Sequence, residues 1–165
     1  MQPFSFAIAV LASAANTQSA PQPAACTGPE YSQMDFWVGD WQLKWDGGQG
    51  TNHITKDYGG CVIEEHFDSQ PAMNLQGHSV SILSNGHWRQ NWVDNEGSYF
   101  DLVGGPQTDG NFVLENVRAN DKTPYRRMMF ENIKPDSLTW HWQGSDDQGK
   151  TWKDRWVIEY TRVKG

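Results

Sequence analysis

The sequence predicts an all-β protein, a closed antiparallel up-and-down β-barrel of about eight to ten strands. From Phe36 onward, short stretches rich in β-branched and aromatic residues alternate with turn signals about every 8–12 residues. Asn85-Gly86 and Asp109-Gly110 are strong hairpin signals, because a type I′ turn needs positive φ at both central residues. Only short turns join the stretches, and closing such a meander into a barrel removes its exposed edges.

Turn residues divide this part of the chain into ten expected strands. They cover residues 36–46, 50–58, 61–68, 76–84, 87–93, 98–104, 111–118, 125–132, 137–143 and 151–162. Trp37, Trp41 and Trp45 are four residues apart, a spacing that also fits one face of a helix. Strands are favoured because Gly interrupts each such window before a helix reaches about 12 residues. A short helical turn around residues 31–36 could cap the barrel.

The N-terminal part of the chain differs in composition from the expected barrel. Phe4 to Ala12 is an apolar run too short to span a bilayer, and Ala12-Ser13-Ala14 fits an A-x-A cleavage site. We therefore expect an exported protein, periplasmic or secreted, although no Lys or Arg precedes the run and a disordered tail is the alternative. The expected organisation is a signal peptide at 1–20, a flexible leader at 21–34 and one barrel domain at 35–165.

Charge excludes two classes of partner. The formal net charge is −7, and Arg126-Arg127 is the largest basic cluster in the sequence. Nucleic acids and anionic lipid surfaces are therefore not expected partners, and no membrane insertion is expected. The oligomeric state is left open.

Cys26 and Cys61 are the two cysteines of the chain. An even number of cysteines in an exported protein permits one disulfide, which would join the leader to the third strand. Two free buried thiols are the alternative. A lipoprotein anchor at Cys26 is disfavoured, because Pro23-Ala24-Ala25 lacks the expected aliphatic residue.

Hairpin register predicts which side chains point into the barrel. A two-residue loop at Asn85-Gly86 pairs Leu83 with Trp88, and the pairs Ser81/Gln90 and Ser79/Trp92 follow on the same face. This face combines aromatic rings with a few polar groups, and we expect it to point inward.

A loop at Gly59-Gly60 gives a second hairpin. The pairs Tyr58/Cys61, Lys56/Ile63, Ile54/Glu65 and Asn52/Phe67 then share one face, and His53 faces His66 on the other. The first face is the apolar one, so it should point inward and carry Glu65 into the barrel.

Gly39-Asp40-Trp41 near the start of the barrel and Arg162 near its end resemble the Gly-x-Trp signature of calycins, the superfamily that includes lipocalins. The resemblance implies that Trp41 closes one end of the barrel and that Arg162, on the last strand, packs over it. Gly39, Trp41 and Arg162 therefore receive structural roles.

A longer resemblance is to bacterial exported proteins related to calycin-like domains of unknown function. The matching segments are Asp35-Phe36-Trp37-Val38-Gly39-Asp40-Trp41, Asn52-x-Ile54, Gly60-Cys61-Val62-Ile63 with Glu65, Gly77-x-Ser79, Trp88-x-Gln90-x-Trp92-Val93-Asp94 and Ser145-Asp146-Asp147-Gln148-Gly149-Lys150-Thr151-Trp152. The resemblance covers nearly the whole mature chain and implies the fold but no function. Members often have Trp where this chain has Phe67.

Ser145-x-Asp147-x-Gly149-x-Thr151-Trp152 also matches the Asp-box hairpin. Asp147 can accept hydrogen bonds from N–H groups of the turn, Gly149 can take positive φ, and Trp152 can pack beneath. The sequence contains one copy, whereas a sialidase needs several, so the expected role is structural.

Glu65 is the sharpest candidate for chemistry. A carboxyl group inside an aromatic barrel is desolvated, which raises its pKa and could make it a general acid or base. Alternatives are a structural carboxylate, paired with Arg126 or Arg127 or hydrogen-bonded to Gln90 and Ser81, and a group that orients a ligand. One of the two arginines should point inward, and the alternation does not say which; Arg127 is placed among the candidate ligand-binding residues.

Other chemistry finds little support in the sequence. No Gly-x-Ser-x-Gly elbow and no phosphate-binding Gly-rich loop occur. A metal at His53 and His66 lacks a third ligand, and haem binding through His141 is a minor alternative. We expect no metal and no cofactor.

The favoured function is binding of a small hydrophobic or aromatic molecule in a Trp-lined cavity. The residues expected to line it are Trp37, Asn52, Glu65, Ser79, Ser81, Trp88, Gln90, Trp92, Arg127, Trp140 and Trp142. One alternative is a cofactor-independent isomerase, cyclase or lyase that uses Glu65 as its acid–base group. Another is a structural barrel with a filled interior.

Overall fold

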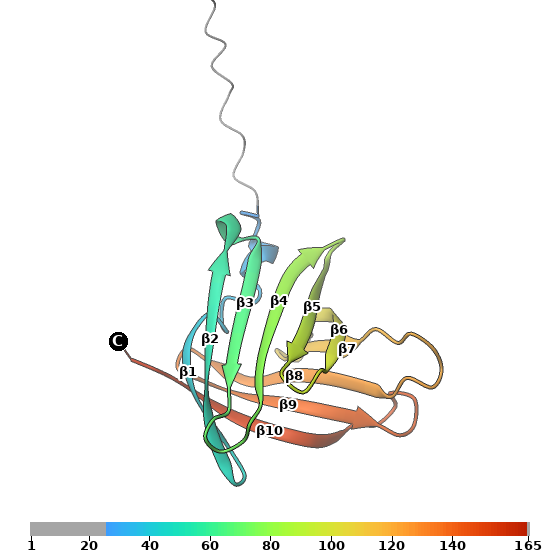
Figure 1. The fold of residues 1–165 in the computed structure, drawn as a ribbon. Coiled ribbons are helices and arrows are strands. Elements are labelled where there is room, and N and C mark those ends of the chain that lie inside the picture. The colour runs from blue at the N-terminus through green and yellow to red at the C-terminus, as the bar shows by residue number, and fades with distance from the viewer. Residues whose placement is uncertain (1–25, 165) are drawn as a thin grey trace, which may run out of the picture.

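The computed structural model describes residues 26–164, which form a closed antiparallel barrel of ten strands. The strands are β1 (Gly39–Trp45), β2 (Gly48–Asp57), β3 (Val62–Asp68), β4 (Gln76–Ser84), β5 (His87–Asp94), β6 (Tyr99–Pro106), β7 (Phe112–Asn116), β8 (Tyr125–Lys134), β9 (Ser137–Ser145) and β10 (Lys153–Arg162). Each strand pairs with its neighbours in sequence, and β10 closes the barrel against β1. The predicted fold class is confirmed. In Figure 1, β2 to β5 stand upright and β8 to β10 run across beneath them.

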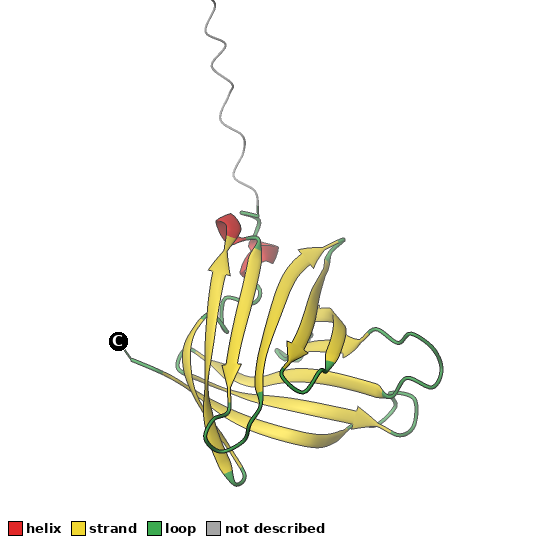
Figure 2. Cartoon of the chain, viewed as in Figure 1, coloured by secondary structure: helices red, strands yellow, loops and turns green. Residues whose placement is uncertain are grey.

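Two 3₁₀ turns are the only helical elements of the described residues: η1 (Pro29–Ser32) and η2 (Tyr58–Gly60). Figure 2 shows both at the same end of the barrel. The helical turn predicted around residues 31–36 overlaps η1 only at residues 31 and 32, and hydrogen-bonded turns follow as far as residue 37. No helix in the described part of the chain is long and apolar enough to cross a membrane.

Register follows the two predicted hairpins closely. Asn85 and Gly86 both have positive φ, and Ser84 pairs with His87, Leu83 with Trp88 and Ser79 with Trp92. In the other hairpin, Ile54 pairs with Glu65 and His53 with His66. The expected Tyr58/Cys61 pair is absent, because residues 58–60 form η2 and the ladder ends at Asp57/Val62.

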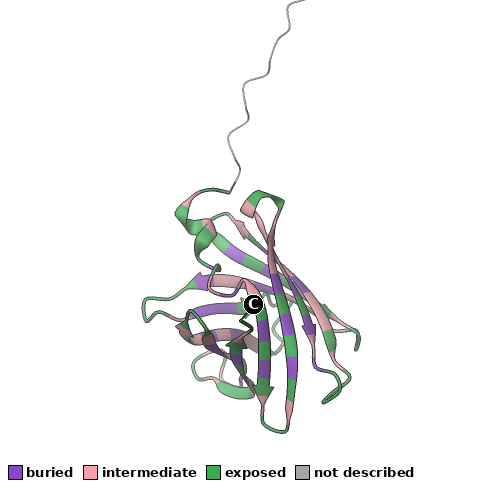
Figure 3. Cartoon of the chain, turned by 90° about the vertical axis from the view of Figure 1, so that its left-hand side faces the viewer, coloured by how far each residue is buried: buried purple, intermediate pink, exposed green. Residues whose placement is uncertain are grey.

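Strand alternation places one face of each strand in the interior. Figure 3 shows buried and exposed residues alternating along the strands. In β3 the buried positions are Ile63, Glu65 and Phe67, whereas His66 is exposed. Glu65 thus points inward as predicted, at 5 % exposure.

The segment before β1 closes one end of the barrel. Met34 and Trp37 are fully buried, and the Trp37 ring packs edge-on against Phe130. The indole N–H of Trp88 donates to the Gln33 side chain across this end, at 3.0 Å. Residues 26–34, expected to be a flexible leader, therefore include part of the packed closure.

Arg162 holds this closure to the last strand. Its guanidinium lies 4.1 Å from the Trp41 ring centroid and donates to the carbonyls of Phe36, Val38 and Pro135. Gly39 has a φ of 132°, and a Cβ there would collide with the same guanidinium. The packing of Arg162 over Trp41 is the contact that the resemblance implied, and the barrel is compatible with a calycin-like fold.

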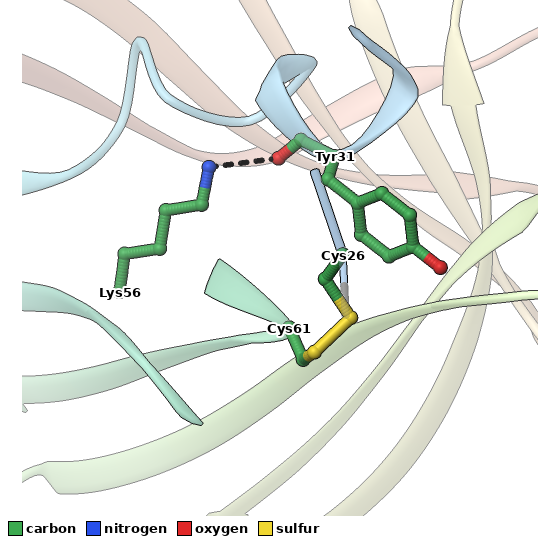
Figure 4. The surroundings of a disulfide bond; sticks show 4 residues. All are labelled: Cys26, Tyr31, Lys56 and Cys61. Carbon is green, nitrogen blue, oxygen red and sulfur yellow. Dashed lines mark hydrogen bonds between the residues drawn. A yellow bond between two sulfur atoms is a disulfide. The ribbon is translucent and has the colours of Figure 1, made fainter. Parts of the chain in front are cut away.

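A disulfide between Cys26 and Cys61 ties the closing segment to the start of β3 (Figure 4). The Lys56 ammonium group reinforces the junction by donating to the Tyr31 carbonyl at 3.0 Å. The disulfide was one of two alternatives open from the sequence. The expected signal peptide at residues 1–20 lies outside the described residues.

Candidate functional site

A cavity of about 230 Å³ occupies the end of the barrel opposite η1, between the β3–β4 loop and the β5–β6 turn. Its middle is ringed by six aromatic side chains, which we call the aromatic belt: Phe67, Trp92, Phe100, Trp140, Trp142 and Trp156. An engineered cavity of about 150 Å³ holds benzene, so this volume suits one ring with a short substituent.

Contacts between neighbouring rings make the belt nearly continuous. Phe67 packs edge-on against both Trp92 and Trp156, with ring centroids 5.9 and 5.8 Å away. Trp156 contacts Trp140 at 6.0 Å, and Trp142 contacts Phe100 at 5.0 Å. Trp140 and Trp142 stack with ring centroids 6.4 Å apart, and Phe100 is the cross-strand partner of Trp92, which completes the circuit. These separations are typical of favourable aromatic pairs.

Gly77 explains how Trp92 fits into this belt. The residue faces Asp94 and lies diagonally from Trp92, whose ring covers it so closely that a Cβ would collide with the ring carbons. The absence of a side chain at this position therefore shapes the cavity wall.

The floor of the cavity is polar and centred on Glu65. The Asn52 amide donates to one carboxyl oxygen at 2.7 Å, and the Ser79 hydroxyl donates to the other at 2.6 Å. The same Asn52 amide lies 3.1 Å from the Tyr160 hydroxyl. Beside this group, Gln90 donates to Ser81. Glu65 and Tyr160 themselves line the cavity.

Burial controls the ionisation of both titratable groups of the floor. It raises the pKa of Glu65 from 4.5 to about 7, against the lowering effect of the hydrogen bonds from Ser79 and Asn52. Burial, and then the nearby Glu65 carboxylate, raise the pKa of Tyr160, so the phenol remains protonated. Glu65 forms no ion pair among the described residues.

Two polar atoms of this region have no hydrogen-bond partner among the described residues. They are the Trp37 indole nitrogen, a donor, and the Asn52 amide oxygen, an acceptor. Unpaired buried polar atoms are costly and uncommon in folded proteins. Asn52 thus offers an unused acceptor next to Glu65.

Asp94 fixes the wall near the opening. Its carboxylate accepts from the Trp92 indole N–H at 2.9 Å and from the backbone N–H groups of Glu96 and Ser98. Partial burial acts to raise the Asp94 pKa, but these hydrogen bonds outweigh it and hold the pKa below 3.8. Asp94 is therefore ionised at neutral pH.

The structure brings together most of the predicted ligand-binding residues. Glu65, Gln90, Trp92, Trp140 and Trp142 line the cavity. Asn52, Ser79 and Ser81 lie behind them as hydrogen-bond partners of Glu65 and Gln90.

Three predicted ligand-binding residues lie elsewhere. Trp37 and Trp88 are buried in the closed end of the barrel. Arg127 lies on the outer face of β8, where it stacks on Trp152 and donates to Gln143. Arg126 instead shares the inward face with Met128 and Phe130. Neither arginine pairs with Glu65.

Sequence reasoning missed other parts of the site. The hairpin register predicts an inward Phe67 but assigns it no role in the site, and the sequence motifs do not identify Phe100, Trp156 or Tyr160 as site residues. Tyr160 shares strand parity with Ile158, so the alternation in β10 was an available signal. No sequence pattern identifies Asp94 as a site residue, because its role depends on the hydrogen bond that it accepts from the Trp92 indole N–H.

The predicted Asp-box residues have a structural role. Asp147 accepts from the Ser145 hydroxyl and from the backbone and hydroxyl of Thr151. These hydrogen bonds lower the Asp147 pKa to about 2. Gly149 has a φ of 85°, as the motif predicts, and a Cβ at this position would lie 3.6 Å from the Trp152 ring.

The histidines lie outside the cavity lining. His66 and His78 are cross-strand neighbours with ring centroids 4.6 Å apart, and His141 contacts Glu131 and Asp154 on the outer face. Within residues 26–164, no group of three or more His, Cys, Asp or Glu side chains is arranged to hold a metal ion.

Fold and cavity together define a ten-strand antiparallel barrel that is packed shut at one end and hollow at the other. The sequence matches no protein-family model and no curated protein.

Proposed function

We propose that this barrel binds a small, largely apolar molecule, with its ring or alkyl body inside the aromatic belt and its polar group at Glu65. The observation that carries the proposal is the cavity of about 230 Å³, walled by six aromatic rings above a buried carboxyl group. Apolar pockets with a few convergent polar groups are the usual form of small-molecule sites. A structural role with a filled interior would not require this space.

Binding can be tested by calorimetry with 4-tert-butylphenol, a neutral molecule with one ring. We expect saturable binding that the Trp142→Ala variant weakens about tenfold, the cost of one good aromatic contact. The matched control is Trp152→Ala, since Trp152 stacks against Arg127 outside the cavity. Loss of binding in the control to the same extent, or no binding by the wild type, would refute the cavity as the site.

Catalysis is the second candidate function. A carboxyl group whose pKa is about 7 is suited to proton transfer at neutral pH, and Glu65 reaches the cavity floor beside the Tyr160 hydroxyl. This supports a cofactor-independent isomerase, cyclase or lyase with Glu65 as acid–base group. Deuterium exchange into a bound carbon acid in D₂O, lost in Glu65→Gln, would favour catalysis over binding alone.

We also propose that the protein is exported and related to calycins. The Cys26–Cys61 disulfide fits an oxidising compartment. The packing of Arg162 over Trp41, next to Gly39, supports the calycin relationship. Periplasmic recovery of the full chain with the disulfide formed would test the first proposal.

A further inference from the structure

All charged side chains among the described residues of the cavity lining are acidic. Glu65 lies at the floor, and Asp94 and Glu96 lie toward the opening. The remaining polar residues of the lining are neutral: Gln90, Ser98 and Tyr160. An occupant with positive charge would therefore meet only favourable charges in the lining.

The aromatic belt adds a second attraction for a cation. The faces of indole rings carry negative electrostatic potential, and a desolvated cation on such a face gains more than it does at an exposed site. Four of the six belt residues are Trp, the best cation–π partner. Trp92 also donates its N–H to the ionised Asp94, which places further negative charge beside that ring.

Acceptors at the floor are available to a donor group. Glu65 has no cationic partner, and the Asn52 amide oxygen has no donor among the described residues. A buried carboxylate without a cation is costly, so an ammonium group that reaches it would relieve this cost. The Trp37 indole N–H, at the closed end of the barrel, is a donor and does not favour a cation.

Nearby arginines in the described part of the chain form no ion pair with these carboxylates. Arg155 lies outside the cavity lining, in an adjoining, more open recess that it shares with Glu96, and its guanidinium lies 3.6 Å from the Asp146 carboxylate. Arg126 lies near Gly144 and donates to the Tyr125 carbonyl. Arg127 is on the outer face, as described above.

We propose that the natural ligand of the cavity is a small organic cation, an amine or quaternary ammonium compound with a compact apolar or aromatic body. This rests on the proposed binding function and names the charge and chemical class of its ligand. The cationic group lies against the aromatic belt and Glu65, and the apolar body fills the remaining volume.

The proposal implies a specific pH dependence. The groups that face Glu65 are Asn52 from β2, Ser79 from β4 and Tyr160 from β10. Tyr160 stays protonated. Asp94 and Glu96 are the other charged residues of the cavity lining. A permanent cation favours the ionised form of Glu65, whose pKa is about 7 without ligand. Its affinity should therefore rise with pH, up to about thirtyfold between about pH 5.5 and about pH 8.

Three para-substituted phenols test the preference for charge, and the first two have the same shape. They are trimethyl(4-hydroxyphenyl)ammonium, its neutral carbon isostere 4-tert-butylphenol and the anion 4-hydroxybenzoate. In calorimetry on the wild type at about pH 8, we expect the cation to bind at least about tenfold more tightly than the neutral isostere, and the anion to bind most weakly. The affinity of the neutral probe should not increase with pH.

The Glu65→Gln variant tests the assigned partner. The cation should lose its pH dependence and most of its advantage, while the neutral probe still binds and so shows that the variant is folded. Equal binding of cation and neutral isostere, or preference for the anion, would overturn the cation proposal and leave the binding function standing. If none of the three probes binds, both proposals fail.

Discussion

Replacing Glu65 with Gln should change how the stability of the barrel depends on pH. The carboxyl group is 5 % exposed, and burial raises its pKa from 4.5 to about 7. Gln has nearly the same shape and can still pair with Asn52 and Ser79, but it does not ionise. The variant therefore removes the titration and keeps the packing.

The direction of this pH dependence is set by which form of Glu65, protonated or ionised, the folded state favours. Because the folded-state pKa lies above the unfolded value, the protonated acid favours the folded state. This contribution is complete below about pH 4.5 and is lost as pH rises through about 7. At about 1.4 kcal/mol for each tenfold change in acidity, the loss is about 3 kcal/mol.

Urea denaturation of both proteins at several pH values measures this difference. We expect the unfolding free energy of the wild type, relative to Glu65→Gln, to fall by about 3 kcal/mol between about pH 4.5 and about pH 8. Other carboxylates titrate equally in both proteins and cancel. A difference that does not vary with pH would refute the assignment of a desolvated carboxyl group at this position.

Three further substitutions test the parts that shape the cavity. Cys26→Ser with Cys61→Ser should lower the unfolding free energy by about 3–4 kcal/mol in urea, because the disulfide closes a loop with a separation of 35 residues; an unchanged midpoint would contradict this. Gly77→Ala should cost about 1–3 kcal/mol and weaken 4-tert-butylphenol binding, because the added methyl group collides with the Trp92 ring; unchanged binding would show that Trp92 does not form the wall. Arg162→Lys should lower the unfolding free energy by about 1–3 kcal/mol, because Lys cannot make all three hydrogen bonds to carbonyl groups. The control Arg118→Lys should lower it less, because Arg118 binds carbonyl groups in a surface loop. Equal losses would argue against a special role for Arg162.

The inward position of Glu65 could be predicted from sequence because tight turns fix register. The turn at Asn85-Gly86 sets every pair between β4 and β5. The turn at Gly59-Gly60 predicts the β2–β3 pairs correctly, except for the Tyr58/Cys61 pair next to the turn. Alternation then places Glu65 on the same face as Ile63 and Phe67. The β-strand period of two makes such an inference robust once one turn is known.

The inward arginine could not be predicted, because its strand follows a longer connection. Residues 117–124 separate β7 from β8, and no short turn transmits the register to Arg126 and Arg127. A bulge between Asp154 and Trp156 similarly breaks the pairing of β9 with β10. Whether a Trp closes the barrel or lines the cavity depends on how side chains from strands distant in sequence fill the interior. No local sequence pattern shows this.

The ionisation of Glu65 depends on both its burial and the occupant of the cavity. Carbon-13 NMR of the Glu65 side-chain carboxyl, assigned by its absence in Glu65→Gln, reports this pKa with and without trimethyl(4-hydroxyphenyl)ammonium. We expect a transition near pH 7 in the free protein that moves to lower pH when the cation binds. A transition near pH 4.5 that the cation, 4-tert-butylphenol and 4-hydroxybenzoate all leave unchanged would contradict a buried carboxyl group at the floor of a ligand cavity.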